Sequence, residues 1–224
     1  MTEDTRAKED PMLSEDDIEI GCIVHSNNHM DYVVEVYRNR DRNRPPEKHE
    51  YAFGQPVYVQ QTVQGDDYAV FGVVYDTQIV DPDQGRAGPR LAAERQDVFT
   101  PGYVQEKQTI LGVAFLGYAA VEEADDGWKV KDVSHEMPPW TLEVDMLVQE
   151  LSDDAFLRLH TVDGDLKLGY YQRLLSTAES FGSEVSLSIL KRLREVTGSE
   201  TDDMLNVLER NIRWQSTSDR GVVR

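Results

Sequence analysis

The strongest constraint on the fold is a series of short β-rich runs, each ended by a turn or a glycine. In the first run, Ile18, Ile20 and Cys22 alternate with other side chains, which is the two-residue period of a strand. A polar turn at 26–28 joins it to the second run, so the pair predicts a hairpin. The runs span residues 18–24, 32–37, 51–61, 68–80, 109–121 and 128–133.

Glycines interrupt the longest runs, at Gly72, Gly112 and Gly117. Such interruptions are typical of bulges and bends in curved sheets. Several runs also carry apolar side chains on both faces. These features predict a small closed or partly open β-barrel, with a two-sheet sandwich as the alternative.

After Pro138 and Pro139 the pattern becomes helical, although 142–148 is ambiguous between strand and helix. Ser152 followed by two aspartates predicts a helix start, and a second helix should run from Gly182 to Gly198. A last helix begins near Thr201. Its apolar stripe, which packs either on its own chain or on a partner, consists of Leu205, Leu208 and Ile212.

The predicted fold class is therefore mainly β with α, a barrel followed by a helical C-terminal extension. We expect four regions along the chain. They are a disordered acidic tail at 1–17, the barrel at 18–135, a mostly helical region at 136–214 and a frayed tail at 215–224. A long connection at 81–102, with one helical turn at 91–95, should lie within the barrel region.

The chain has 42 acidic against 23 basic residues, a formal charge of −19 and a pI near 4.5. This balance argues against a general nucleic-acid coat or an anionic-membrane binder, because both need a positive field. Only 7 of the basic residues are lysine. An acid-rich, lysine-poor surface predicts adaptation to high salt, as in a haloarchaeal protein. Neither an apolar membrane span nor a signal core is evident, which predicts a cytoplasmic protein.

Common catalytic motifs are missing from the sequence. It contains no Gly-Lys pair, no GxSxG and no GxGxxG, which excludes the usual ATP-binding loop, serine-hydrolase elbow and dinucleotide fingerprint. The single cysteine, Cys22, lies in an apolar run and is interpreted as a core residue. We therefore assign no catalytic, cofactor or metal-binding residue.

Two sets of residues nevertheless leave a metal site open as an alternative interpretation. His25, His29 and Asp31 lie close together in a turn, although zinc sites need three or four convergent ligands. Acidic pairs such as Asp66–Asp67 and Asp153–Asp154 are of the type that holds magnesium, but they are expected in so acidic a chain. A small metal-dependent hydrolase remains the third hypothesis.

The loop at 38–48 carries a net positive charge in an otherwise acidic chain. Its basic residues, the candidate contacts for a partner or a nucleic acid, are Arg38, Arg40, Arg42, Arg44 and Lys48. Arginine forks grip phosphates and acidic protein surfaces equally well. The open interpretations are a solvated loop, a protein contact, or a DNA contact in which strand aromatics also stack on bases.

The order of strands resembles a known barrel. The supporting segments are 20–24, 32–36, 51–59, 70–74, 110–118 with its Leu-Gly-Tyr ending, Pro138–Pro139, and 166–169. Together they resemble the HAS barrel, found at the N-terminus of HerA-type DNA translocases and of ATP synthase α and β subunits. The resemblance covers residues 18–170. The ATPase domain has no counterpart, so its ATP-binding residues cannot be carried over.

In that family the barrel serves ring assembly and the docking of partners such as the NurA-type nuclease. The resemblance therefore implies a non-enzymatic interaction module that docks to a DNA-processing ATPase or nuclease through strand edges and loops. Self-association is also compatible with this role. The alternative is a nucleic-acid-binding β-barrel that uses Arg38–Arg44.

Overall fold

The computed structural model describes residues 13–14, 16–80, 108–162, 165–177, 181–197 and 202–220. Seven strands form one antiparallel sheet. Their bounds are β1 Glu19–Ser26, β2 Asp31–Val36, β3 Pro56–Val63, β4 Asp66–Val80, β5 Gln108–Ala124, β6 Gly127–Ser134 and β7 Leu147–Glu150. The first six overlap the six predicted runs, because short-range alternation and turn residues fix such strands locally. The third run starts late: β3 begins at Pro56, after a turn at 51–55, and not at residue 51.

The sheet closes on itself as a six-stranded barrel. The order runs β2-β1-β7-β3-β4-β5, and β2 then pairs with β5 to complete the circle. Strand β5 is long enough to serve two neighbours: residues 110–114 pair with β2, and residues 118–124 pair with β6. Strand β6 therefore lies outside the closed circle. The predicted fold class, a barrel followed by helices, is confirmed.

Two apolar clusters lie on opposite sides of the barrel wall. Along β3, Val57 and Val59 point into the barrel, whereas Tyr58 between them joins the cluster beneath the helices. Strand alternation produces this arrangement, since successive side chains point to opposite faces. The wall is thus buried on both faces where the helices pack against it.

Glycines shape the wall at two positions. The β4–β5 register shifts between Phe71 and Gly72, so the predicted irregularity at Gly72 is confirmed. At Gly117, a Cβ atom would collide with the Ser134 carbonyl of β6 and crowd the Phe71 ring. Only glycine lets the two backbones approach this closely.

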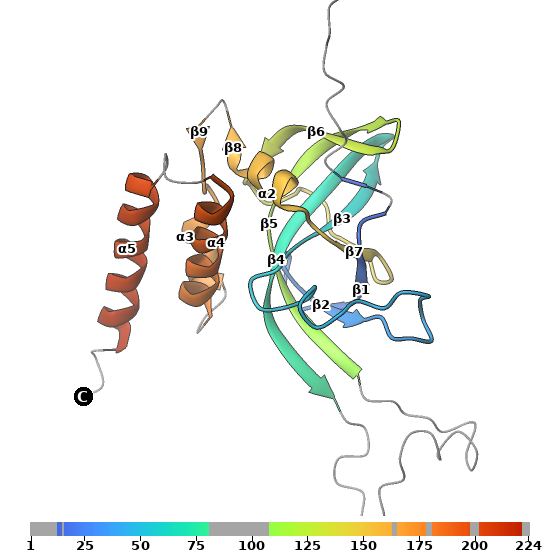
Figure 1. Ribbon diagram of the computed structural model, residues 1–224, viewed down its shortest axis with the longest axis horizontal. Coiled ribbons are helices and arrows are strands. Elements are labelled where there is room, and N and C mark those ends of the chain that lie inside the picture. The colour runs from blue at the N-terminus through green and yellow to red at the C-terminus, as the bar shows by residue number, and fades with distance from the viewer. Residues whose placement is uncertain are drawn as a thin grey trace, which may run out of the picture.

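The helical region covers one outer side of the barrel (Figure 1). Its helices are α2 Asp153–His160, α3 Tyr171–Thr177, α4 Gly182–Thr197 and α5 Asp202–Arg220, and a two-stranded ribbon of β8 Thr161–Val162 and β9 Asp165–Leu166 follows α2. The Ser152 hydroxyl accepts a hydrogen bond from Ala155 N, so the predicted N-cap is confirmed. Helix α3 and the ribbon were not predicted, because both are too short to show a period.

Three boundaries differ from the predicted regions. Leu13, assigned to the disordered tail, is 1% exposed and forms a two-way backbone pair with Trp128. The ambiguous segment contains β7, which inserts between β1 and β3 and so belongs to the barrel. The backbone of α5 remains helical through Arg220, beyond the predicted fraying point at Gln215. The predicted connection at 81–102 lies outside the described residues.

The apolar stripe of α5 packs within its own chain. Leu205 and Ile212 are fully buried, and Leu208 packs against the same cluster beneath the barrel wall. Of the two interpretations left open by the sequence, the structure therefore supports intramolecular packing. None of the described helices is long and apolar enough to cross a membrane.

Candidate interaction surfaces

The loop at 38–48 has most of its arginines next to carboxylates. Arg42 pairs with Glu19 and lies 4.3 Å over the Tyr37 ring. Arg38 contacts Glu35 at 3.2 Å, and also lies 3.5 Å from Asp41.

Further along the same loop, Arg44 contacts the buried carboxylate of Glu50 at 3.1 Å. Arg40 and Lys48 are exposed. The predicted contact residues thus share one loop, but at least three of the five, Arg38, Arg42 and Arg44, are engaged with anions of the same chain. Pairing lowers the positive potential that a phosphate or an acidic surface would meet.

Cys22 is part of strand β1, which β2 and β7 flank. Burial raises the pKa of its thiol, although a hydrogen bond with Tyr37 acts in the opposite direction. A raised pKa reduces the thiolate fraction and hence the nucleophilicity at neutral pH. The Cys22 side chain is only partly buried and belongs to neither apolar cluster, so the interpretation as a core residue is wrong, whereas the raised pKa still argues against a nucleophile.

The candidate metal ligands near the β1–β2 turn make separate contacts. His29 Nε2 lies 2.7 Å from the Pro138 carbonyl, and the Asp31 carboxylate accepts hydrogen bonds from Tyr75 and Asn27. His25 is exposed. Within the described parts of the chain, no three His, Cys, Asp or Glu side chains are placed to hold a metal ion.

Strand β4 extends beyond the part of the wall that β3 covers. The β3–β4 pairing ends at Pro56 and Val73, and among the described strands only β5 pairs with β4 from Asp76 to Val80. Ile79 is 76% exposed and Val80 is 41% exposed. This projecting segment, 76–80, therefore presents a strand edge together with apolar side chains.

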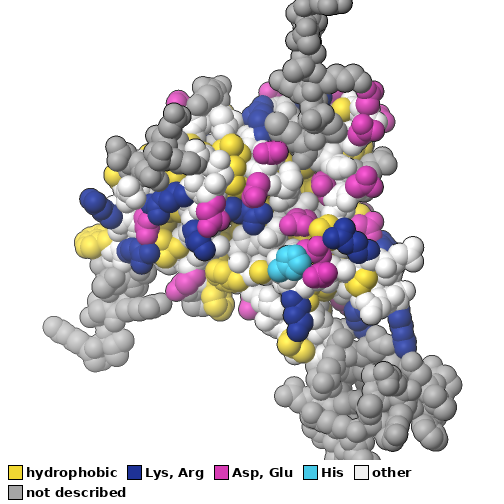
Figure 2. Space-filling model, viewed as in Figure 1, with side chains coloured by type: hydrophobic (Ala, Val, Ile, Leu, Met, Phe, Trp, Pro, Cys, Tyr) yellow, Lys and Arg dark blue, Asp and Glu magenta, His cyan; other side chains and the backbone are white. Residues whose placement is uncertain are grey.

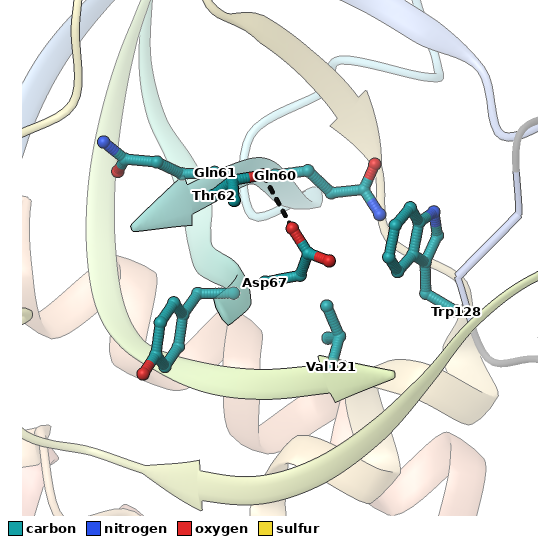
Figure 3. Close-up of a pocket in the computed structure, with 7 residues that line it drawn as sticks. Gln60, Gln61, Thr62, Asp67, Val121 and Trp128 are labelled. Atoms are coloured by element: carbon teal, nitrogen blue, oxygen red, sulfur yellow. Dashed lines mark hydrogen bonds between the residues drawn. The ribbon is translucent and has the colours of Figure 1, made fainter. Parts of the chain in front are cut away.

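A cavity of about 140 Å³ lies at the opposite end of β4, where the β3–β4 and β5–β6 hairpins meet (Figure 3). It is lined by Gln60, Gln61, Thr62, Asp67, Tyr68, Val121 and Trp128. Thr62 donates its hydroxyl to Asp67 Oδ1 at 2.6 Å. Among the described residues, Gln60 Nε2 is buried and has no hydrogen-bond partner, and the Gln60 carboxamide lies beside the Trp128 ring.

A buried polar network joins the barrel to the helices. His160 is fully buried, with Nδ1 2.7 Å from the Phe156 carbonyl and Nε2 2.6 Å from the Tyr170 hydroxyl. His135, just after β6, lies 2.8 Å from the Leu159 carbonyl and accepts a hydrogen bond from Gly169 N. Burial lowers the pKa of both imidazoles, that of His160 to about 3.

Both histidines are thus held neutral, with each ring nitrogen engaged. The network is a satisfied structural joint, because every polar atom at this depth needs a partner. Sequence reasoning missed it, since the two histidines are 25 positions apart and no local motif connects them. The pocket was also missed. In the sequence, Asp67 belongs to one of several acidic pairs and Trp128 to a short β-rich run, and neither pattern connects them.

A closed six-stranded barrel with a helical layer on one side places the chain among small β-barrel proteins that carry a helical C-terminal region. Its sequence matches the model of the family described as "Domain of unknown function (DUF8166)" over residues 4–223, and the chain belongs to that family. No curated protein matches it.

Proposed function

We propose that this protein is a non-enzymatic assembly module that resembles the HAS barrel and docks to a DNA-processing ATPase or nuclease. The observation that carries the proposal is the projecting edge of β4. A closed barrel removes its own strand edges, so an edge that extends beyond the closed wall is a specific departure from that rule.

An exposed edge offers a partner strand a row of backbone donors and acceptors. Peptides commonly add to a sheet in this way, and pockets or apolar side chains supply the specificity. Here Ile79 and Val80 provide the apolar contacts. Asp76 accepts a hydrogen bond from Thr77 N at 2.8 Å, which occupies one backbone donor near the base of the segment. Among the described residues, the part of the edge left for a partner is therefore its outer end.

The test is co-purification with the HerA-type ATPase and its nuclease from the same source, in high salt. Replacing Ile79 and Val80 by lysine should abolish co-purification, because charges on an edge oppose strand pairing. Val144 is 59% exposed on a loop away from the edge, so Val144→Lys is the matched control. Retention of the partner by the double variant would exclude docking at this edge.

The nucleic-acid alternative depends on the 38–48 loop, the place where cationic side chains cluster. Replacing Arg38, Arg40, Arg42 and Arg44 by alanine should abolish DNA retention if that loop binds DNA, and should leave the protein partner bound. Retention should also fall steeply with added salt. If retention is unchanged in the four-fold variant, the loop is not the contact.

The metal-dependent hydrolase is tested separately. Metal analysis of the purified protein, together with a nuclease assay in magnesium or manganese, should detect both a bound ion and turnover. A blank result in both measurements would exclude it. In the acidic pair Asp153–Asp154, the Asp153 carboxylate already accepts a hydrogen bond from Arg192 at 2.7 Å, which makes it less available to a metal ion.

A further inference from the structure

We propose that the cavity between Trp128 and Asp67 binds the side chain of an arginine presented by a partner protein. This inference depends on the proposed docking function only for the source of that arginine. The binding site itself rests on three observations: an aromatic wall, a directed carboxylate, and an acidic rim.

The aromatic wall is the indole of Trp128. Its position is fixed by two backbone hydrogen bonds with Leu13, of 3.1 and 2.7 Å. Val121, which is 9% exposed, supplies an apolar floor. Figure 3 shows the indole ring facing the interior of the cavity, opposite Asp67. A flat aromatic face of this kind attracts a cation, and a planar guanidinium stacks on it better than an ammonium does.

The carboxylate is held in place by a neighbour on the paired strand. Thr62 and Asp67 are register partners, and the Thr62 hydroxyl donates to Asp67 Oδ1. In Figure 3 the other carboxylate oxygen points toward the Trp128 side of the cavity. A guanidinium stacked on the indole would donate N–H groups to this oxygen, which is the strong, charge-assisted type of hydrogen bond.

The rim of the cavity is acidic on the same face. Glu123 is the register partner of Trp128, and successive side chains of a strand alternate between faces. Lys129 and Lys131 therefore point to the opposite face, where Lys131 pairs with Glu122 at 2.6 Å. Acidic side chains gather at this end of the barrel, at the upper right of Figure 2.

These features select among ligand classes. The acidic rim repels phosphate, so a nucleotide that stacks on Trp128 would meet unfavourable charge. A purely apolar group would add no polar contact to the Asp67 carboxylate beyond the hydrogen bond from Thr62. The cavity of about 140 Å³ has room for several water-sized groups, which suits a guanidinium head. An arginine side chain satisfies the wall, the carboxylate and the rim together.

The test uses the full chain and a minimal probe, N-acetyl-arginine methylamide, with the citrulline analogue as an uncharged isostere. Binding is followed through the indole N–H signals in NMR, with the Trp128 signal assigned from Trp128→Phe. We expect a saturable shift of the Trp128 signal with the arginine probe and none with citrulline. Asp67→Asn should weaken binding about tenfold, the order expected for one charge-assisted hydrogen bond.

Asp66→Asn is the matched control, because Asp66 is exposed and alternates to the other face of the strand. Equal shifts with arginine and citrulline, or an Asp67→Asn variant that binds like the unmodified protein, would overturn the proposal. The sequence carries an arginine, Arg6, seven positions before Leu13. A shift that appears only after Arg6→Ala would assign the site to the chain's own N-terminal segment and overturn the partner assignment. The Ile79 and Val80 variants should still bind the probe, which separates failure of this site from failure of edge docking.

Discussion

His160 Nε2 and the Tyr170 hydroxyl lie 2.6 Å apart at the joint between the barrel and the helices. The opposite ring nitrogen, Nδ1, lies 2.7 Å from the Phe156 carbonyl. Because a carbonyl can only accept, Nδ1 carries the proton, and Nε2 accepts from the tyrosine. Both ring nitrogens are used by the neutral imidazole. Protonation at Nε2 would reverse the hydrogen bond with Tyr170, whose hydroxyl proton would then need another acceptor.

We therefore predict that acid weakens this joint. The pKa of His160 falls from its ordinary value of 6.5 to about 3 in the folded protein, mainly through burial. The unfolded chain then binds more protons than the folded chain between these two values. The contribution of neutral His160 to the free energy of unfolding is therefore complete above pH 6.5. It is lost as the pH falls toward 3, at up to about 1.4 kcal/mol per pH unit.

Urea unfolding of the protein and of His160→Phe, each measured from pH 7.5 to pH 4.5, checks this prediction. The many carboxylates titrate in both proteins, so the informative quantity is the difference between their free energies of unfolding. That difference should shrink as the pH falls. If the free energies of unfolding of the two proteins change in parallel with pH, His160 titrates equally in the folded and unfolded chains.

Cys22 should react slowly with thiol reagents in the folded protein. Burial raises the pKa of its thiol, so the thiolate that attacks the reagent is scarce. As the chain has one cysteine, the Ellman reaction reports this site alone. We expect at least a tenfold slower reaction at pH 8 than in guanidinium chloride, where the thiol behaves as in a free peptide. A native rate equal to the denatured rate would contradict the partly buried environment of the thiol.

Leu13→Ala should destabilise the fold by about 2–4 kcal/mol, because it empties a buried site at the edge of the outer core. Leu13 is 1% exposed and shares that cluster with Tyr58. Val207, 57% exposed on α5, provides the control: Val207→Ala should change the free energy of unfolding by less than about 0.5 kcal/mol. An equal effect of the two changes would mean that the segment around Leu13 does not belong to the folded unit.

Gly117→Ala should destabilise the contact between β5 and β6. The added methyl group would meet the Ser134 carbonyl and the Phe71 ring, and overpacking of this kind costs about 1–3 kcal/mol. Thermal unfolding of this variant should be compared with that of Ala120→Ser, a change at a half-buried position of the same strand. A melting temperature unchanged from the parent protein would show that the strands can separate at no cost.

The barrel strands and most helix starts could be predicted because their signals are local. Alternation at 18–24, the irregularity at Gly72 and the Ser152 cap each depend on residues within one element. Strand β7 could not be assigned in this way. Its four residues become a strand because β1 and β3 offer edges on either side, and a sheet of that order exists only after the chain has folded.

The sequence by itself determined the strand runs, the helix caps, the acid excess and the absence of common catalytic motifs. Tertiary structure decided which side chains meet. It placed Trp128 opposite Asp67, joined His135 to His160, and positioned carboxylates next to Arg42 and Arg44. Periodicity assigns a residue to a face of its own strand or helix, but the partner of that face depends on barrel closure and helix docking, which bring together residues distant in the chain.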